Sequence, residues 1–224
     1  MERRQFTAAL MGSLAAGVAL PAFALSQGDA AAGIRAALER GAIAAVDLLG
    51  RSDGFLGNPK VRIGLPGFLE DEAKLLKYTG QSHRVEELET AMNRAAEAAV
   101  PQAKSMLVSA AKSVTVEDAL RIVRGNDTSV TDYFSSRTRE PLSVQFLPIV
   151  TRATEQVALT DRYNAVAGRI ASFGLLKERD ANIEQYVTAK ALDGLFLMIG
   201  EEERKIRADP LKTGSDLLRR VFGR

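Results

Sequence analysis

The first residues suited to chemistry are two opposite charges beside an apolar segment. Lys190 and Asp193 stand three residues apart, so on a helix they lie on one face and can pair. The segment that follows, "LFLMI" at 195–199, is apolar on every side of a helix. Such a helix packs in the interior, and charges beside it are paired or reach water through a cleft. The pair therefore marks a structural contact or the wall of a binding site.

A second polar group interrupts the alanine-rich stretch "MNRAAEAAV". Asn93, Arg94 and Glu97 fill one side of this helix, and apolar residues cover the rest of it. The functional hypothesis is that these three residues face Lys190 and Asp193 across a polar cleft that binds a small ligand. The competing interpretation is a solvated Arg94–Glu97 pair on one helix and a structural pair at the edge of another. Acid–base catalysis by lysine or carboxylate groups would use the same cleft.

Signatures of other catalytic sites and of metal sites are missing. The chain has no cysteine and a single histidine, His83, which we interpret as an exposed residue near a helix start, so we expect no metal and no cofactor. "SAAK" at 109–112 and "KTG" at 212–214 match two motifs of penicillin-recognising enzymes, but the middle motif is absent and KTG precedes an amphipathic helix. The acidic and basic residues of "EEERKIR", 201–207, are interpreted as ordinary pairs on a solvated helix surface.

The first 24 residues have the features of an export signal. Arg3 and Arg4 precede an apolar run at 8–20, and Ala22 and Ala24 form an A-x-A cleavage pattern. The apolar run is shorter than the roughly 20 residues that span a bilayer. The start "RRQF" is similar to the twin-arginine export signal, and the general secretory route is the alternative.

Cleavage after Ala24 would leave residues 25–224 as one periplasmic domain without a transmembrane segment. Removing two arginines and one glutamate from 30 basic and 28 acidic residues leaves this mature chain close to neutral. A nucleic-acid partner is not expected, because such a protein carries a marked basic excess. A chain of this length buries a sufficient core without disulfides.

The spacing of apolar residues predicts an all-α, single-domain bundle of about eight to ten short and medium helices. "RSDGFLGNPKVRIGLPG", residues 51–67, is predicted to be a long irregular loop because it contains four glycines and two prolines. Pro141 predicts a break between two helices. After a first helix that ends near Leu49, glycine and proline positions predict helices near 68–79, 82–100, 102–113, 116–124, 129–138, 141–157, 160–173, 181–208 and 213–222.

The last predicted helix, "GSDLLRRVFGR", is amphipathic. Leu217, Leu218, Val221 and Phe222 gather on one side of it, and arginines occupy the others. Two interpretations stay open: the helix docks on the core, or it contacts lipid or a partner protein of the cell envelope.

Several long segments resemble the bacterial domain-of-unknown-function family 4197. They are "ELETAMNRAAEAAVPQAK", "SVTVEDALRIVRG", "FLPIV" and "YVTAKALDGLFLMIGEEERKIRADPLKTGSDLLRRVFG". The resemblance implies an exported bacterial protein with one family domain, and it implies no activity, substrate or catalytic residue. The sequence is thus best interpreted as a non-catalytic periplasmic module, binding or structural, with an unknown small molecule or protein partner. A small-molecule enzyme and an envelope-associated protein are the alternatives.

Overall fold

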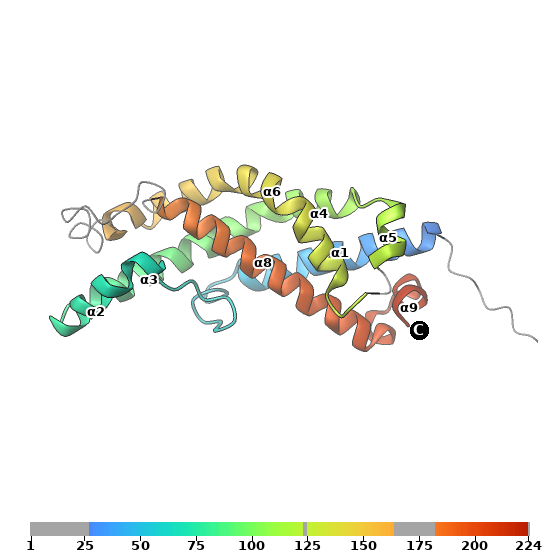
Figure 1. The fold of residues 1–224 in the computed structure, drawn as a ribbon, viewed down its shortest axis with the longest axis horizontal. Coiled ribbons are helices and arrows are strands. Elements are labelled where there is room, and N and C mark those ends of the chain that lie inside the picture. The colour runs from blue at the N-terminus through green and yellow to red at the C-terminus, as the bar shows by residue number, and fades with distance from the viewer. Residues whose placement is uncertain (1–26, 123–124, 164–181, 224) are drawn as a thin grey trace, which may run out of the picture.

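The computed structural model describes residues 27–122, 125–163 and 182–223, whose arrangement Figure 1 shows. No β-strand occurs among these residues, so the predicted all-α single-domain bundle is confirmed. Four long helices carry the fold: α1 (Gln27–Leu49), α3 (Ser82–Ala99), α6 (Ser129–Gln156) and α8 (Ile183–Ala208). The shorter elements are η1 (Gly67–Leu69), α2 (Glu70–Tyr78), η2 (Val100–Ala103), α4 (Lys104–Lys112), α5 (Val116–Ile122), η4 (Pro210–Thr213) and α9 (Asp216–Phe222).

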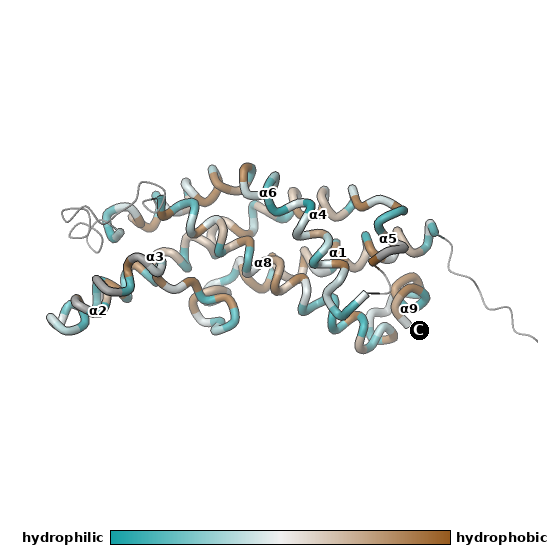
Figure 2. The backbone as a smooth tube through the Cα atoms, in the orientation of Figure 1, coloured by the Kyte–Doolittle hydropathy of each residue, from teal (hydrophilic) through white to brown (hydrophobic). Residues whose placement is uncertain are grey.

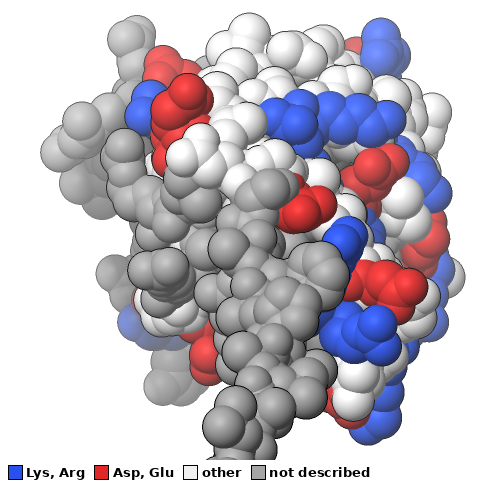
Figure 3. Space-filling model, turned by 90° about the vertical axis from the view of Figure 1, so that its right-hand side faces the viewer, with Lys and Arg blue, Asp and Glu red and all other residues white. Residues whose placement is uncertain are grey.

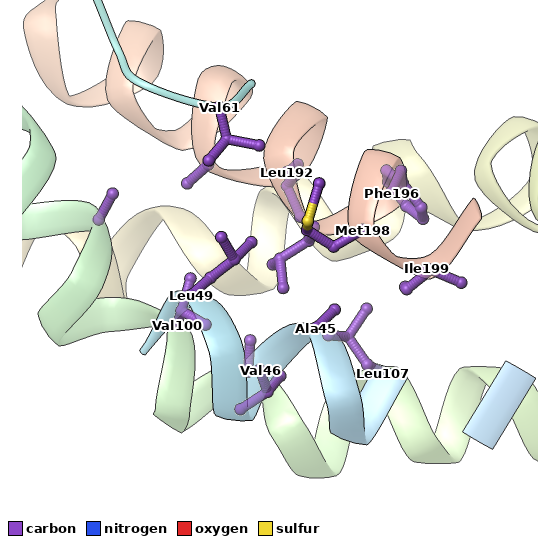
Figure 4. Close-up of a cluster of buried hydrophobic side chains, with 14 of the residues drawn as sticks. Ala45, Val46, Leu49, Val61, Val100, Leu107, Leu192, Phe196, Met198 and Ile199 are labelled. Atoms are coloured by element: carbon purple, nitrogen blue, oxygen red, sulfur yellow. The ribbon is translucent and has the colours of Figure 1, made fainter. Parts of the chain in front are cut away.

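Helix α8 is the central element, and it packs mainly on α1 and α6. Figure 4 shows apolar side chains of α1 facing those of α8 across the core. Gly41 permits this close approach, because a Cβ atom there would lie 3.2 Å from the Ile199 side chain. On the other side, the rings of Phe134 in α6 and Phe196 in α8 meet edge to face at 5.9 Å. The expected all-round burial of 195–199 holds except at Leu197, which is exposed.

The predicted break at Pro141 is wrong, because α6 runs through it as one helix of 28 residues. Pro141 lies on the solvent side of the helix, and so does Pro148. The residues that face inward, Leu142 and Phe146, are buried. Packing on α8 and α3 therefore outweighs the main-chain hydrogen bonds that the prolines remove.

The C-terminal helix α9 docks on the core. Leu218, Val221 and Phe222 are buried, and the Val221 side chain lies directly over Gly33 of α1. The Arg207 guanidinium stacks on the Phe222 ring at 4.9 Å. The docked interpretation is thus supported, and the expectation of a lipid or partner contact through this face is not, since α1 already covers it.

The outer surface carries both basic and acidic side chains. Figure 3 views the molecule from the end at which α5 and α9 lie, and Lys/Arg groups are interspersed there with Asp/Glu groups. None of the described helices is long and apolar enough to cross a membrane. The predicted signal, 1–24, and most of the predicted helix at 160–173 lie outside the described residues.

Candidate functional site

The side chain of Asn93 holds the irregular loop 51–67 through hydrogen bonds to main-chain atoms of the loop. Its carboxamide accepts a hydrogen bond from the Ile63 N–H at 2.9 Å and donates one to the Ile63 C=O at 2.8 Å. A third hydrogen bond, 2.7 Å long, goes to the Glu89 C=O of the same helix. The side chain has no exposed surface, and it pairs with the extended segment as a neighbouring β-strand would. Asn93 thereby satisfies main-chain groups that would otherwise be buried without partners.

Glu97 holds the first half of the same loop. Its Oε1 accepts hydrogen bonds from the N–H groups of Phe55 and Leu56, both at 3.0 Å. Its Oε2 accepts one from Arg94 Nη1 at 2.6 Å. The other guanidinium nitrogen of Arg94 binds Asp53 at 2.8 Å. The hydrogen bond to Glu97 is the main cause that raises the pKa of Arg94 above its ordinary value. Desolvation opposes this effect, and the hydrogen bond to Asp53 adds to it.

The loop is also fixed from the side of α8. The Phe55 ring packs so closely on Gly194 that a Cβ atom there would lie 2.7 Å from it. The Tyr186 hydroxyl donates a hydrogen bond to the Gly64 C=O at 3.0 Å. Burial, ahead of the charge of Asp193, raises the pKa of the Tyr186 hydroxyl. The loop thus lies between α3 and α8 and is bonded to both.

Lys190 and Asp193 form a surface network on the outer side of α8. They pair with each other at 3.8 Å, and both side chains are about half exposed. Asp193 has a closer partner in Arg139 of α6, at 2.7 Å. The same Arg139 guanidinium stacks on Phe196 at 5.1 Å, and the Lys190 ammonium lies 5.8 Å from the Tyr186 ring. These contacts tie α6 to α8 at the surface.

The two groups of sequence-predicted residues therefore do not meet in the described chain. Asn93, Arg94 and Glu97 bond to the loop, whereas Lys190 and Asp193 bond to each other and to α6. The space between α3 and α8 that was expected to hold a ligand is filled by the protein's own loop. A ligand-binding role for these five residues stays a prediction, and the contacts give each of them a structural one.

A hollow that sequence reasoning missed lies where this loop meets α1 and α8. Its volume is about 430 Å³. The polar residues around it are Asn58, Lys60, Glu201, Glu202 and Lys205, and its apolar floor consists of Ala44, Ala45, Leu48 and Met198. Nothing local in the sequence predicts the hollow, because one of its sides comes from α8, which is far along the chain from α1 and the loop.

Opposite charges pair around the rim of the hollow. Lys60 Nζ contacts both carboxylate oxygens of Glu201, at 2.8 and 3.0 Å. The hydrogen bond from Lys60 holds the pKa of Glu201 below its ordinary value. Glu202 lies between Lys205 at 3.3 Å and Arg40 at 3.5 Å. The rim thus presents ammonium and carboxylate groups close to apolar surface.

Glu203 corrects the prediction that the acidic residues at 201–203 all lie on a solvated surface. It is buried, and it accepts hydrogen bonds from the N–H groups of Val130 and Thr131 at 3.1 and 2.8 Å. The Thr131 hydroxyl and Arg207 donate two more, at 2.7 and 2.9 Å. Glu203 of α8 thereby caps the start of α6, where free N–H groups and the helix dipole favour an anion.

His83 is exposed at the second position of α3, so that prediction is confirmed. It lines a second hollow of about 610 Å³ together with Arg94 and the paired Glu87 and Arg162, which lie 3.0 Å apart. No group of three or more potential metal ligands occurs in the described part of the chain.

Comparison with known proteins agrees with the resemblance found in the sequence. The model of a protein family described as "Protein of unknown function (DUF4197)" matches residues 24–223, nearly the whole chain. The comparisons with curated proteins and with solved structures found no match.

Proposed function

The chain belongs to this family, the DUF4197 proteins of unknown function, and from its geometry we propose that it is an exported, non-catalytic binding module of the periplasm. The observation that carries the proposal is the loop 51–67, which is bonded to α3 and α8 and forms one side of the hollow beside Lys60. Loops that a rigid scaffold holds in place are where binding residues concentrate.

Export is supported by the boundary of the family match. The match begins at residue 24, where the predicted signal ends, so the residues before it are not part of the family domain. The described part of helix α1, from Gln27 onward, lies after the predicted cleavage site. A leader removed after Ala24 would leave every described residue in the mature chain.

The hydrogen-bond partners of the buried polar side chains support the proposal that the module is non-catalytic. Asn93, Glu97 and Glu203 each bond to main-chain atoms of another segment. Their hydrogen-bonding capacity is used in holding the fold, and it is not directed at a substrate. A carboxylate that acts as a general base must reach the proton of its substrate.

The hollow fits a small molecule that has a charged head and a short apolar part. The apolar floor, which includes Leu48 and Met198, would take the apolar part. Lys60 and Lys205 would bind a carboxylate or phosphate head, while Glu201 and Glu202 would bind an amine. Because the loop is already held in place, little conformational entropy is lost on binding.

Native mass spectrometry of the mature protein from its own periplasm tests this proposal. We expect a bound small molecule in the wild-type protein and none in Ala44→Leu, which fills the hollow. Ala98→Leu is the matched control, since Ala98 is an exposed alanine of α3 outside the hollow. The control should keep the molecule.

Two results would contradict the proposal. A wild-type protein without a bound molecule contradicts the binding function. A molecule that is kept in Ala44→Leu but lost in Asp193→Ala moves the site to the residues that the sequence predicted.

A further inference from the structure

Helix α6 carries an exposed stripe along its outer side. The helix runs along one edge of the molecule in Figure 1, with apolar positions along it in Figure 2. The stripe is formed by Arg137, Pro141, Val144, Pro148 and Glu155, all of them exposed, with Val144 at 71%. Together with the partly buried Thr151, these residues recur at alternating steps of four and three. That is the spacing by which helices pair along a seam.

Four charged residues flank the apolar middle of the stripe, and residues at equal distances from its centre carry opposite charges. Arg137 and Glu140 lie before the apolar middle, and Arg152 and Glu155 lie after it. None of these four groups forms an ion pair with another residue that the structure describes. Arg139 points elsewhere, since it is paired with Asp193.

We propose that this stripe binds the same stripe of a second copy of the chain, with the two α6 helices antiparallel. A two-fold axis at the level of Phe146 places Arg137 against the partner's Glu155 and Glu140 against the partner's Arg152. The same axis places Val144 against the partner's Pro148.

Charge decides the partner and its direction. Every charge of the stripe meets an opposite one in the antiparallel arrangement, whereas a parallel one would place Arg137 against the partner's Arg137. Such a contact is self-complementary, as a two-fold interface requires. We expect the dimer to be reversible, because the apolar middle is short. Only its central side chains exclude water, and the outer charges stay at the solvated rim.

Sedimentation velocity of the mature protein over a concentration series tests the dimer. Arg137→Glu places like charges together twice in the dimer, and so does Glu155→Arg. We expect each single variant to weaken the dimer about tenfold, which corresponds to roughly 1.4 kcal/mol. The double variant Arg137→Glu/Glu155→Arg restores opposite charges across the axis, and we expect it to restore the wild-type affinity.

The rescue cannot come from a contact within one helix. Residues 137 and 155 lie about 27 Å apart along α6, at roughly 1.5 Å of rise per residue. Recovery in the double variant therefore identifies a contact between two copies. A wild-type protein that stays monomeric throughout, or a dimer whose affinity the single variants leave unchanged, would overturn the proposal.

A second pair of variants tests the apolar middle. Val144→Lys places a charge at the centre of the seam, and Leu211→Lys is the matched control because Leu211 is also 71% exposed but lies in η4. We expect dimerisation to be lost in the first variant and kept in the second, with unchanged helical content by circular dichroism in both. Equal behaviour of the two variants would place the interface away from α6.

Discussion

At the residue scale, buried polar side chains act as anchors for main-chain groups that no regular helix or strand hydrogen bond satisfies. Asn93 and Glu97 replace the hydrogen bonds that a neighbouring strand or a turn would supply to the loop 51–67. Glu203 does the same for the first turn of α6. A buried donor or acceptor without a partner is costly, so each anchor contributes more to stability than an exposed pair.

The first prediction concerns Asn93. Replacing it by alanine leaves the N–H and the C=O of Ile63 without partners, at about 1–3 kcal/mol for each group. We expect Asn93→Ala to lower the free energy of unfolding by about 3 kcal/mol in urea denaturation. Asn126→Ala is the control, since Asn126 is exposed and its side-chain oxygen accepts only a local hydrogen bond from the Thr128 N–H. Equal small effects of both changes would show that the loop does not depend on this anchor.

The second prediction concerns Glu203. In Glu203→Gln the amide NH₂ would face main-chain N–H groups, and Arg207 would lose its carboxylate contact at 2.9 Å while it keeps its hydrogen bond to Ser129. We expect a loss of about 3 kcal/mol in the free energy of unfolding. Glu202→Gln affects only partly exposed ion pairs with Arg40 and Lys205, so it should change stability by less than about 1 kcal/mol. Chemical denaturation of both variants separates the two cases, and a mild effect at Glu203 would argue against the capping role.

The third prediction concerns ionisation at the hollow. Lys60 is the main cause of the lowered pKa of Glu201, so Lys60→Ala should raise that pKa toward its ordinary value. The pKa of Glu201 is lower in the folded protein than in the unfolded chain. The Lys60–Glu201 pair therefore stabilises the fold at pH values above the unfolded pKa, and this stabilisation is lost as the pH falls through the folded pKa. NMR titration of the Glu201 carboxyl group measures the shift. Lys205→Ala is the control, and an equal shift there would contradict the assigned cause.

At the element scale, tertiary packing decides where helices continue and where they end. Helix α6 passes through two prolines because both lie on the solvent side, while Leu142 and Phe146 are buried on the other. The prolines mark the outer face that we propose as a dimer contact. Helix α9 has only seven residues and is held by its contacts with α1.

The fourth prediction concerns α9. Deleting residues 213–224 exposes the core positions of α1 that Leu218, Val221 and Phe222 cover. Burial of three such side chains contributes on the order of 5 kcal/mol, so we expect a large loss of stability in thermal and chemical unfolding. A truncated protein that folds normally but is no longer recovered with envelope fractions would favour an interaction tail instead.

At the scale of the whole molecule, the fold suits export in the folded state. An all-α bundle with many local contacts folds quickly, and a chain without cysteine needs no oxidising compartment to complete its fold. The twin-arginine signal that "RRQF" resembles is therefore consistent with the domain that follows it.

The fifth prediction concerns this signal. Replacing Arg3 and Arg4 by lysines keeps the charge but removes the twin-arginine pattern. We expect the precursor to accumulate in the cytoplasm, as measured by cell fractionation and by the mass of the chain. Continued export of the double variant would point to the general secretory route.

Local spacing was enough to predict the all-α class, most of the helices, the long loop, the apolar side of α9 and the family, but not the continuity of α6 through Pro141. Those features follow from local spacing, since a helix repeats every 3.6 residues and glycine and proline act where they stand. The export signal was interpreted from the same kind of local pattern, and it stays a prediction.

The roles of the polar side chains, in contrast, depend on how the helices and the loop pack. The periodicity of α3 places Asn93 and Glu97 on one face, but it does not say that the loop 51–67, and not Lys190 and Asp193, lies against that face. Glu201 meets Lys60 across 141 residues of sequence. The physical reason is that helical periodicity sets the direction of a side chain, whereas its partner depends on how distant segments pack.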